Sequence, residues 1–144
     1  MEAFLMTLAV ITVGLMAGVY VAFSVIVMPA LKQVDAENGA TVMQIINRDI
    51  VSSVFMFLFW LSSLLSLFLL VVSQQWIVKG GCALYLVGML GVTAVFNVPL
   101  NKQLEAVTPH TKLMVWRRYL TRWCWWNHCR TVTSAITLIV FAAQ

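Results

Sequence analysis

The sequence predicts an all-α fold: an integral membrane four-helix bundle formed as one domain by residues 1–144. Three observations support this class. Hydrophobic residues make up 62% of the chain and charged residues only 10%, whereas soluble domains carry about 45–50% apolar and about 25% charged residues. Long uncharged runs divide the chain, and basic residues gather at their ends. A soluble fold could not bury this apolar excess.

The uncharged runs define the expected spans, and they cover Ala3–Leu31, Ile50–Val78, Gly80–Asn101 and Thr131–Gln144. The first three are long enough to cross a hydrocarbon core of about 30 Å. The fourth spans only if its helix begins near Trp123, which draws polar residues into its first turns. We therefore expect membrane spans at about residues 3–31, 50–73, 78–100 and 124–143.

The three connections differ in length and charge. Thr41–Arg48 can form an amphipathic lead-in to the second span, and Lys112–Arg122 a short amphipathic interfacial helix before the fourth span. The second connection offers only Lys79. The first and third connections together hold seven basic residues: Lys32, Arg48, Lys102, Lys112, Arg117, Arg118 and Arg122. The positive-inside rule therefore places loops one and three in the cytoplasm and both termini outside.

Composition also argues against several classes of function. The net charge of +4 is explained by orientation in a membrane, and without a nucleic-acid motif we expect no nucleic-acid partner. Cys82, Cys124 and Cys129 form no CxxC pair and are an odd number, so no disulfide framework is expected. A single histidine within the spans, without a nearby carboxylate, does not supply a metal site. We therefore expect no dedicated metal site; the expectation of no cofactor rests on the resemblance described below.

The third span ends with two amides on one helix face. Asn97 and Asn101 are four residues apart, and Pro99 between them removes a backbone donor and frees a carbonyl near Val95. One interpretation is a kink whose freed carbonyl an amide satisfies. The other is a pair of amides that face the bundle interior and orient a polar ligand.

The fourth span begins with "WNHCRT", which places Asn127, His128 and Arg130 at membrane depth. Polar groups there are costly and suggest function. Arg130 can instead extend to lipid phosphates, and His128 can form a bond between helices. His128 can also act as a ligand or proton carrier, since imidazole titrates between pH 5 and 8.

Further residues are expected at the same cytoplasmic end. Met28 precedes Pro29 where the first span kinks or stops, and Asn47 can reach inward from the start of the second span. Trp123 belongs to an aromatic belt with its neighbours. His110 either covers this end or is exposed. Together these positions predict a binding pocket that opens toward the cytoplasmic leaflet.

The first span carries small residues at every fourth position, namely Gly14, Gly18 and Ala22. Such a stripe allows another helix to approach closely. The stripe packs another helix either within the bundle or across the interface of a homo-oligomer, so a homo-oligomer is one of the two expected assemblies.

Three stretches in this order resemble a known family: "GVYVAFSVIVMPAL", "TAVFNVPLN" and "W..Y...W..WNHCRT". The chain is similar, from Gly14 to about Ala135, to an integral membrane family of uncharacterised bacterial proteins that includes the fungal anthrone oxygenases. The resemblance implies a four-helix membrane fold, in a bacterial inner membrane. For the anthrone oxygenase branch it implies cofactor-free oxidation of an anthrone by O2.

On this resemblance, His128 would be the catalytic base and Arg130 would stabilise the enolate. The amides of Asn97, Asn101 and Asn127 would share that role. The pocket expected at the cytoplasmic end adds Trp123, Asn47 and Met28 as substrate-binding residues. The expected partners are membrane lipid and a lipophilic, anthrone- or quinol-like small molecule. Two alternatives remain open: a non-catalytic protein that binds a quinone, haem or lipid or serves as a subunit of a complex, and an oligomeric transporter or channel.

Overall fold

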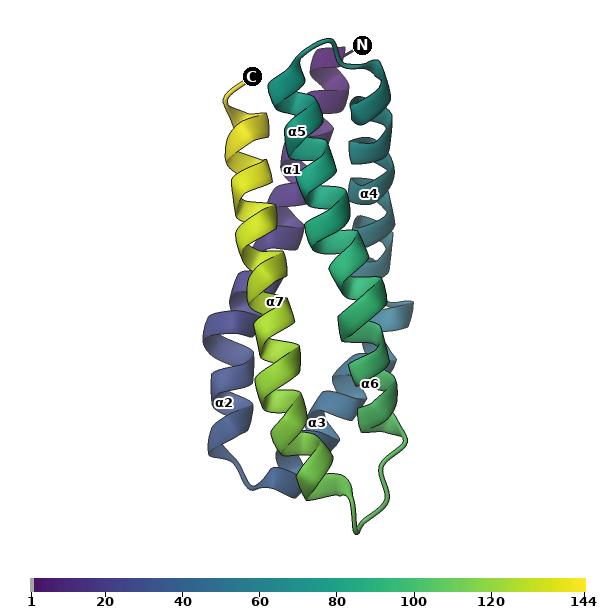
Figure 1. The fold of residues 1–144 in the computed structure, drawn as a ribbon, viewed down its shortest axis with the longest axis vertical. Coiled ribbons are helices and arrows are strands. Elements are labelled where there is room, and N and C mark those ends of the chain that lie inside the picture. The colour runs from purple at the N-terminus through teal and green to yellow at the C-terminus, as the bar shows by residue number, and fades with distance from the viewer. Residues whose placement is uncertain (1) are drawn as a thin grey trace.

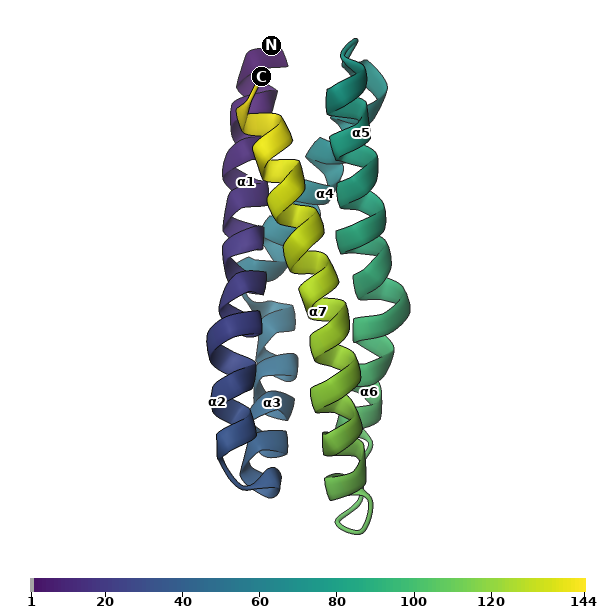
Figure 2. The same cartoon turned by 60° about the vertical axis from the view of Figure 1, so that its left-hand side comes forward.

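The computed structural model describes residues 2–144, where every regular element is helical. The first column runs through α1 (Glu2–Ala22), a π-helical turn η1 (Phe23–Val27) and α2 (Met28–Gln33). The chain returns through α3 (Ala36–Asp49), the 3-10 turn η2 (Ile50–Ser52) and α4 (Val54–Val72). Figures 1 and 2 show these elements as long antiparallel columns.

The second half of the chain adds two more columns. One contains α5 (Trp76–Tyr85), the π-helical turns η3 (Leu86–Gly91) and η4 (Thr93–Asn97), and α6 (Val98–Glu105). The last is α7 (Lys112–Ala142). Both termini lie at the end of the molecule that carries the α4–α5 connection, opposite the α2–α3 and α6–α7 connections (Figure 1).

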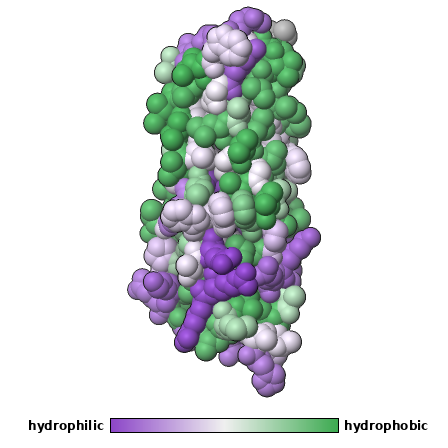
Figure 3. Space-filling model, in the orientation of Figure 1, coloured by the Kyte–Doolittle hydropathy of each residue, from purple (hydrophilic) through white to green (hydrophobic). Residues whose placement is uncertain are grey.

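Three helices are long and apolar enough to cross a membrane: Ala3–Gln33, Val54–Val72 and Trp76–Glu105. The chain is therefore a multi-pass membrane protein. In Figure 3 the upper part of the surface is mainly hydrophobic, and hydrophilic residues gather toward the lower end. This is the end with the α2–α3 and α6–α7 connections, where the sequence places most of its basic residues.

The fourth column differs from the expectation. The structure has no separate interfacial helix before a fourth span, because α7 is one uninterrupted helix of 31 residues. Its first part is the amphipathic segment expected on the membrane surface. Its second part contains Asn127, His128 and Arg130, and α7 is not among the helices apolar enough to span. The count of four helices is not confirmed either, since the second column is divided into α3 and α4.

The division between α3 and α4 occurs at Ser53. This residue adopts an extended conformation, with φ −97° and ψ 169°, and its side-chain oxygen accepts a hydrogen bond from the backbone N–H of Phe55. Serine is a favoured N-cap because its oxygen satisfies a free amide of the first helical turn. The break therefore starts a new helix at the point where the apolar stretch begins.

Two π-helical turns come directly before the prolines of the first and third columns. Pro29 follows η1 and Pro99 follows η4. Proline cannot donate to the carbonyl four residues earlier and clashes with it. These carbonyls belong to Val25 and Val95, at the middle of the two π turns. Each helix thus widens before its proline and then continues. Such π turns inside helices are frequent at functional sites.

Two clusters of buried side chains hold the columns together. One lies toward the termini and includes Met16, Phe59, Leu69 and Tyr85. The other lies toward the α2–α3 and α6–α7 connections. Its fully or nearly buried members are Met28, Leu31, Ala40, Met43, Leu100, Leu104, Trp116, Tyr119 and Trp123. A layer of polar side chains separates the two clusters.

Close approach depends on glycines outside the stripe noted in the sequence. A Cβ at Gly14 would lie 3.5 Å from Leu138, an ordinary contact, and one at Gly18 would meet nothing within 4 Å. A Cβ at Gly88, by contrast, would lie 2.4 Å from Cγ2 and 2.6 Å from Cβ of Thr133 on α7. Tight contacts between columns are therefore at Gly88 and also at Gly39, where a Cβ would lie 2.8 Å from the Leu31 carbonyl oxygen and 2.9 Å from Trp116.

We predict that Gly88→Ala lowers the free energy of unfolding by about 1–3 kcal/mol, because the added methyl group overlaps Thr133. Gly80→Ala is the matched control, since a Cβ at Gly80 meets nothing within 4 Å. It should stabilise the helix by up to about 1 kcal/mol. Thermal unfolding in detergent measures both, and equal melting temperatures for the two variants would contradict this packing.

Candidate functional site

A cavity of about 300 Å³ lies between the two buried clusters, lined by side chains from all four columns. Its lining is mostly aromatic and aliphatic. The polar side chains that line it are Tyr20, Asn47, Thr93, Asn97, Asn101 and Arg130. A mostly apolar cavity with a few polar groups is typical of a site for a small molecule, and this volume is at the small end of that class.

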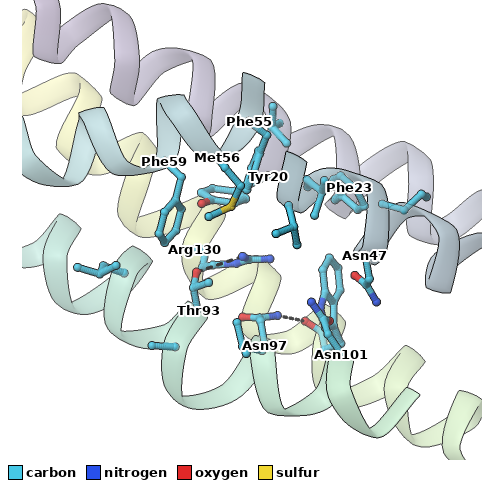
Figure 4. Close-up of a pocket in the computed structure, with 18 of the residues that line it drawn as sticks. Tyr20, Phe23, Asn47, Phe55, Met56, Phe59, Thr93, Asn97, Asn101 and Arg130 are labelled. Atoms are coloured by element: carbon cyan, nitrogen blue, oxygen red, sulfur yellow. Dashed lines mark hydrogen bonds between the residues drawn. The ribbon is translucent and has the colours of Figure 1, made fainter. Parts of the chain in front are cut away.

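Arg130 is the charged centre of the cavity and is 5% exposed. Its terminal nitrogens donate hydrogen bonds to Thr93 Oγ1 at 3.2 Å and to Asn127 Oδ1 at 2.7 Å. The guanidinium also lies over the rings of Tyr20 at 4.4 Å and Trp123 at 5.4 Å. Figure 4 shows it beside Thr93, pointing into the cavity. All four partners are neutral, so they stabilise the buried cation without cancelling its charge.

Several polar atoms around the guanidinium have no hydrogen-bond partner within the described chain. They are Arg130 Nε, the Tyr20 hydroxyl, Asn97 Oδ1 and Trp123 Nε1. All four belong to residues that line the cavity. Unpaired buried polar groups are costly, and these atoms leave three donors and one acceptor unsatisfied beside the cavity.

Asn127 holds the guanidinium from behind, outside the cavity lining. Its Nδ2 donates to the backbone carbonyl of Tyr20 at 3.0 Å and to Ser24 Oγ at 2.8 Å, while its Oδ1 receives Arg130. The side chain thus connects α7 to the first column. It is 1% exposed, and its role is to fix Arg130.

His128 lies on the outer side of this connection. Its side chain is exposed, and Nδ1 is 2.9 Å from Ser24 Oγ. Ser24 Oγ is also 3.0 Å from Thr131 Oγ1. Ser24 and Asn127 therefore stand between the imidazole and the guanidinium, and His128 does not line the cavity.

A second hydrogen-bonded layer closes the cavity toward α3 and α6. The Tyr119 hydroxyl donates to Asn101 Oδ1 at 2.8 Å and accepts from Asn47 Nδ2 at 3.4 Å. Burial raises the pKa of the Tyr119 hydroxyl, so the hydroxyl stays protonated and remains a donor. Its ring stacks between Trp116 and Trp123, with centroids 5.8 and 5.5 Å away.

The structure brings together most of the residues expected at the site. Asn47, Asn97, Asn101, Trp123 and Arg130 all line the cavity. Asn97 Nδ2 donates across to the Trp123 carbonyl at 3.4 Å, so this amide links two columns rather than repairing the kink before Pro99.

Three expected site residues lie elsewhere. Met28 is buried in the cluster next to the α2–α3 connection. Asn127 is behind Arg130, and His128 faces outward. His110 is exposed on the α6–α7 connection and does not line the cavity. Helix rotation explains the position of His128: Asn127 and Arg130 share the inner face of α7, whereas His128 is turned by about 100° from Asn127.

Sequence reasoning missed the aromatic wall and one polar contact. Tyr20, Phe23, Phe55 and Phe59 line the cavity together with Thr93. The sequence could have indicated Tyr20 as a site residue, because it is the one tyrosine in the uncharged first span. The phenylalanines lie in two spans, the first and the second, which are so uniformly apolar that no pattern separates cavity-lining positions from lipid-facing ones.

No group of three His, Cys, Asp or Glu side chains in the described chain is placed to hold a metal ion. The donors around the cavity are a guanidinium, amides, hydroxyls and an indole. Such a set binds oxygen atoms of an organic ligand rather than a transition metal.

Fold and cavity together define a helical membrane protein with an aromatic cavity centred on a buried cation. The anthrone oxygenase family model matches residues 40–140. The chain therefore belongs to the anthrone oxygenase family. No match was found among curated proteins or among solved structures.

We predict that Asn127→Ala lowers the free energy of unfolding by about 1–3 kcal/mol, because Arg130 loses a partner and stays buried. His128→Ala should change it by no more than about 0.5 kcal/mol, since that ring is exposed. Melting temperatures in detergent distinguish the two, and a larger loss for His128→Ala would contradict the arrangement.

Proposed function

We propose that this protein oxidises a lipophilic aromatic substrate, anthrone- or quinol-like, with O2 inside the cavity and without a cofactor. Membership of the anthrone oxygenase family supports the general chemistry. The aromatic lining supports a flat ring system as the ligand. Most basic residues lie on α2, α3, α6 and the first part of α7, the helices that flank the α2–α3 and α6–α7 connections, and they support a cytoplasmic location for this end of the molecule.

One observation carries the proposal: among the described residues that line the cavity, Arg130 alone is charged. The guanidinium is fixed by Thr93 and Asn127 and faces no carboxylate that would neutralise it. A preorganised cation in an apolar cavity stabilises negative charge far better than the same cation in water. An enolate oxygen of an ionised anthrone is such a charge.

For an anthrone, the reaction balances without a further reactant; a quinol would instead give its two electrons and two protons to O2, forming the quinone and H2O2. Loss of a proton from the ring CH2 gives an enolate whose carbon carries an electron pair. That carbon transfers electrons to O2 and forms a C–O bond to it, giving a hydroperoxide after protonation. Cleavage of the O–O bond with loss of the remaining C–H proton yields the ketone and water. The CH2 group is oxidised to C=O, and one O2 gives one carbonyl oxygen and one water.

The assignment of roles follows the geometry of α7. Arg130 is the proposed catalytic residue, because it stabilises the enolate and so lowers the pKa of the bound CH2 group. His128, expected to be the base, is separated from the cavity by Ser24 and Asn127. We propose that His128 supports Arg130 through these two side chains and that a solvent molecule in the cavity accepts the first proton.

Oxygen uptake by the purified protein tests this function, with anthrone and a benzoquinol as substrates. Arg130→Met should lower kcat/KM for anthrone at least about a hundredfold, because about 2.7 kcal/mol or more of oxyanion stabilisation is lost. His128→Ala should retain activity within about tenfold of the wild type. Both variants are compared at equal folded concentration, judged from thermal unfolding.

The opposite ranking, with His128→Ala inactive and Arg130→Met active, would refute these roles. Saturable binding of anthrone without oxygen uptake by the wild type would favour the second candidate function, a non-catalytic quinone- or lipid-binding protein. The lining favours this candidate in one respect, because the described residues around the cavity include no Asp, Glu or His.

A further inference from the structure

The cavity reaches the molecular surface at one side, between the start of α4 and the η4–α6 segment. Four lining residues are exposed there: Val51, Trp60, Ala94 and Val98. All are apolar, and they come from η2, α4, η4 and α6. We call this opening, defined by these four residues, the lateral mouth.

The lateral mouth exists because two columns separate at this level. α4 packs against α1, α5 and η3, but makes no close backbone contact with η4 or α6. The extended conformation of Ser53 ends α3 and starts α4 beside the opening. The π turn η4, widened before Pro99, forms the facing wall. Because both helices are interrupted here, their backbones stay apart, and only side chains border the mouth.

The other walls of the cavity are closed by specific contacts. Toward α3 and α6, the hydrogen bonds of Tyr119 to Asn47 and Asn101 form a layer above a buried cluster. Toward the first column, Asn127 is bonded to Ser24 and to the Tyr20 carbonyl. Toward the termini, a continuous buried cluster blocks access. The lateral mouth is the side that these contacts leave open.

The surroundings of the lateral mouth are hydrophobic and belong to membrane-spanning helices. Val54 is 73% exposed, Phe57 65% and Val95 61%, and they flank the mouth on Val54–Val72 and Trp76–Glu105. Exposed apolar side chains on spanning helices contact lipid hydrocarbon. The mouth therefore opens into the acyl-chain region, at the end of α4 near its α3 connection.

We propose that the bilayer itself delivers the ligand through the lateral mouth. The ligand is then a neutral, flat ring system dissolved among acyl chains, which becomes an anion only after it reaches Arg130. This identification of the ligand state rests on the proposed function. A charged substrate would pay a large desolvation cost on the same route. O2 is apolar and dissolves well in hydrocarbon, so both reactants share this path.

The test measures ligand association directly, independently of turnover. The probe is 2-hydroxyanthraquinone, a three-ring ketone that O2 does not oxidise, at a pH where it is neutral. Binding in mixed phosphatidylcholine–detergent micelles is followed by stopped-flow quenching of tryptophan emission, since Trp60 and Trp123 line the cavity. Anthrone-dependent oxygen uptake is recorded for the same samples.

Ala94→Phe narrows the lateral mouth and should slow association at least tenfold. Trp60→Ala widens it and should speed association severalfold. Val95→Phe is the matched control: it adds a ring at the neighbouring lipid-facing position outside the cavity lining, and its rate should stay within twofold of the wild type. Equal melting temperatures establish that the variants are folded.

An association rate unchanged by Ala94→Phe, or slowed equally by Val95→Phe, would overturn the proposal. So would a wild type that shows no saturable binding, because an open apolar mouth must admit this ring system. If the mouth variants act as expected but no variant consumes O2, the lateral route stands and the proposed oxygenase function fails.

Discussion

The structure is organised around one buried cation, Arg130, that has no anion beside it. Placing a charge in a protein interior costs several kcal/mol even after relaxation. Here two aromatic faces and two charge-assisted hydrogen bonds offset that cost, at about 2 kcal/mol for a desolvated cation–π contact and about 1.5–3 kcal/mol for each hydrogen bond. The protein thus retains the electrostatic potential of the guanidinium in the cavity, where a carboxylate would have cancelled it.

The surrounding helices serve to hold that cation at a fixed place. Asn127 is bonded to Arg130, Ser24 and the Tyr20 carbonyl, so the first column fixes the orientation of a side chain on α7. Thr93 reaches the same guanidinium from a π turn whose geometry depends on Pro99. The helix irregularities therefore matter for function: they bring a hydroxyl to the guanidinium and part α4 from α6.

Much of this arrangement was accessible from the sequence, and the failures have physical causes. Uncharged runs gave the membrane class, and costly polar residues pointed to Arg130, Asn97 and Asn101. Sequence spacing does not fix helix rotation near an interface, so the sequence left open which way His128 faces, and the structure places it outward. Charges suggested that Lys112–Arg122 forms its own helix, yet without a glycine or proline to break it the segment continues as α7.

The central claim is that Arg130 stabilises negative charge on a bound aromatic oxygen. Titrating bound 2-hydroxyanthraquinone by its visible absorption tests this most directly. The account predicts that the pKa of the bound hydroxyl falls by at least about one unit, or about 1.4 kcal/mol, relative to empty micelles, and that Arg130→Met abolishes the fall. An unchanged or raised pKa in the wild type would contradict the account, since a buried cation that leaves the ligand hydroxyl un-ionised cannot be the source of catalysis.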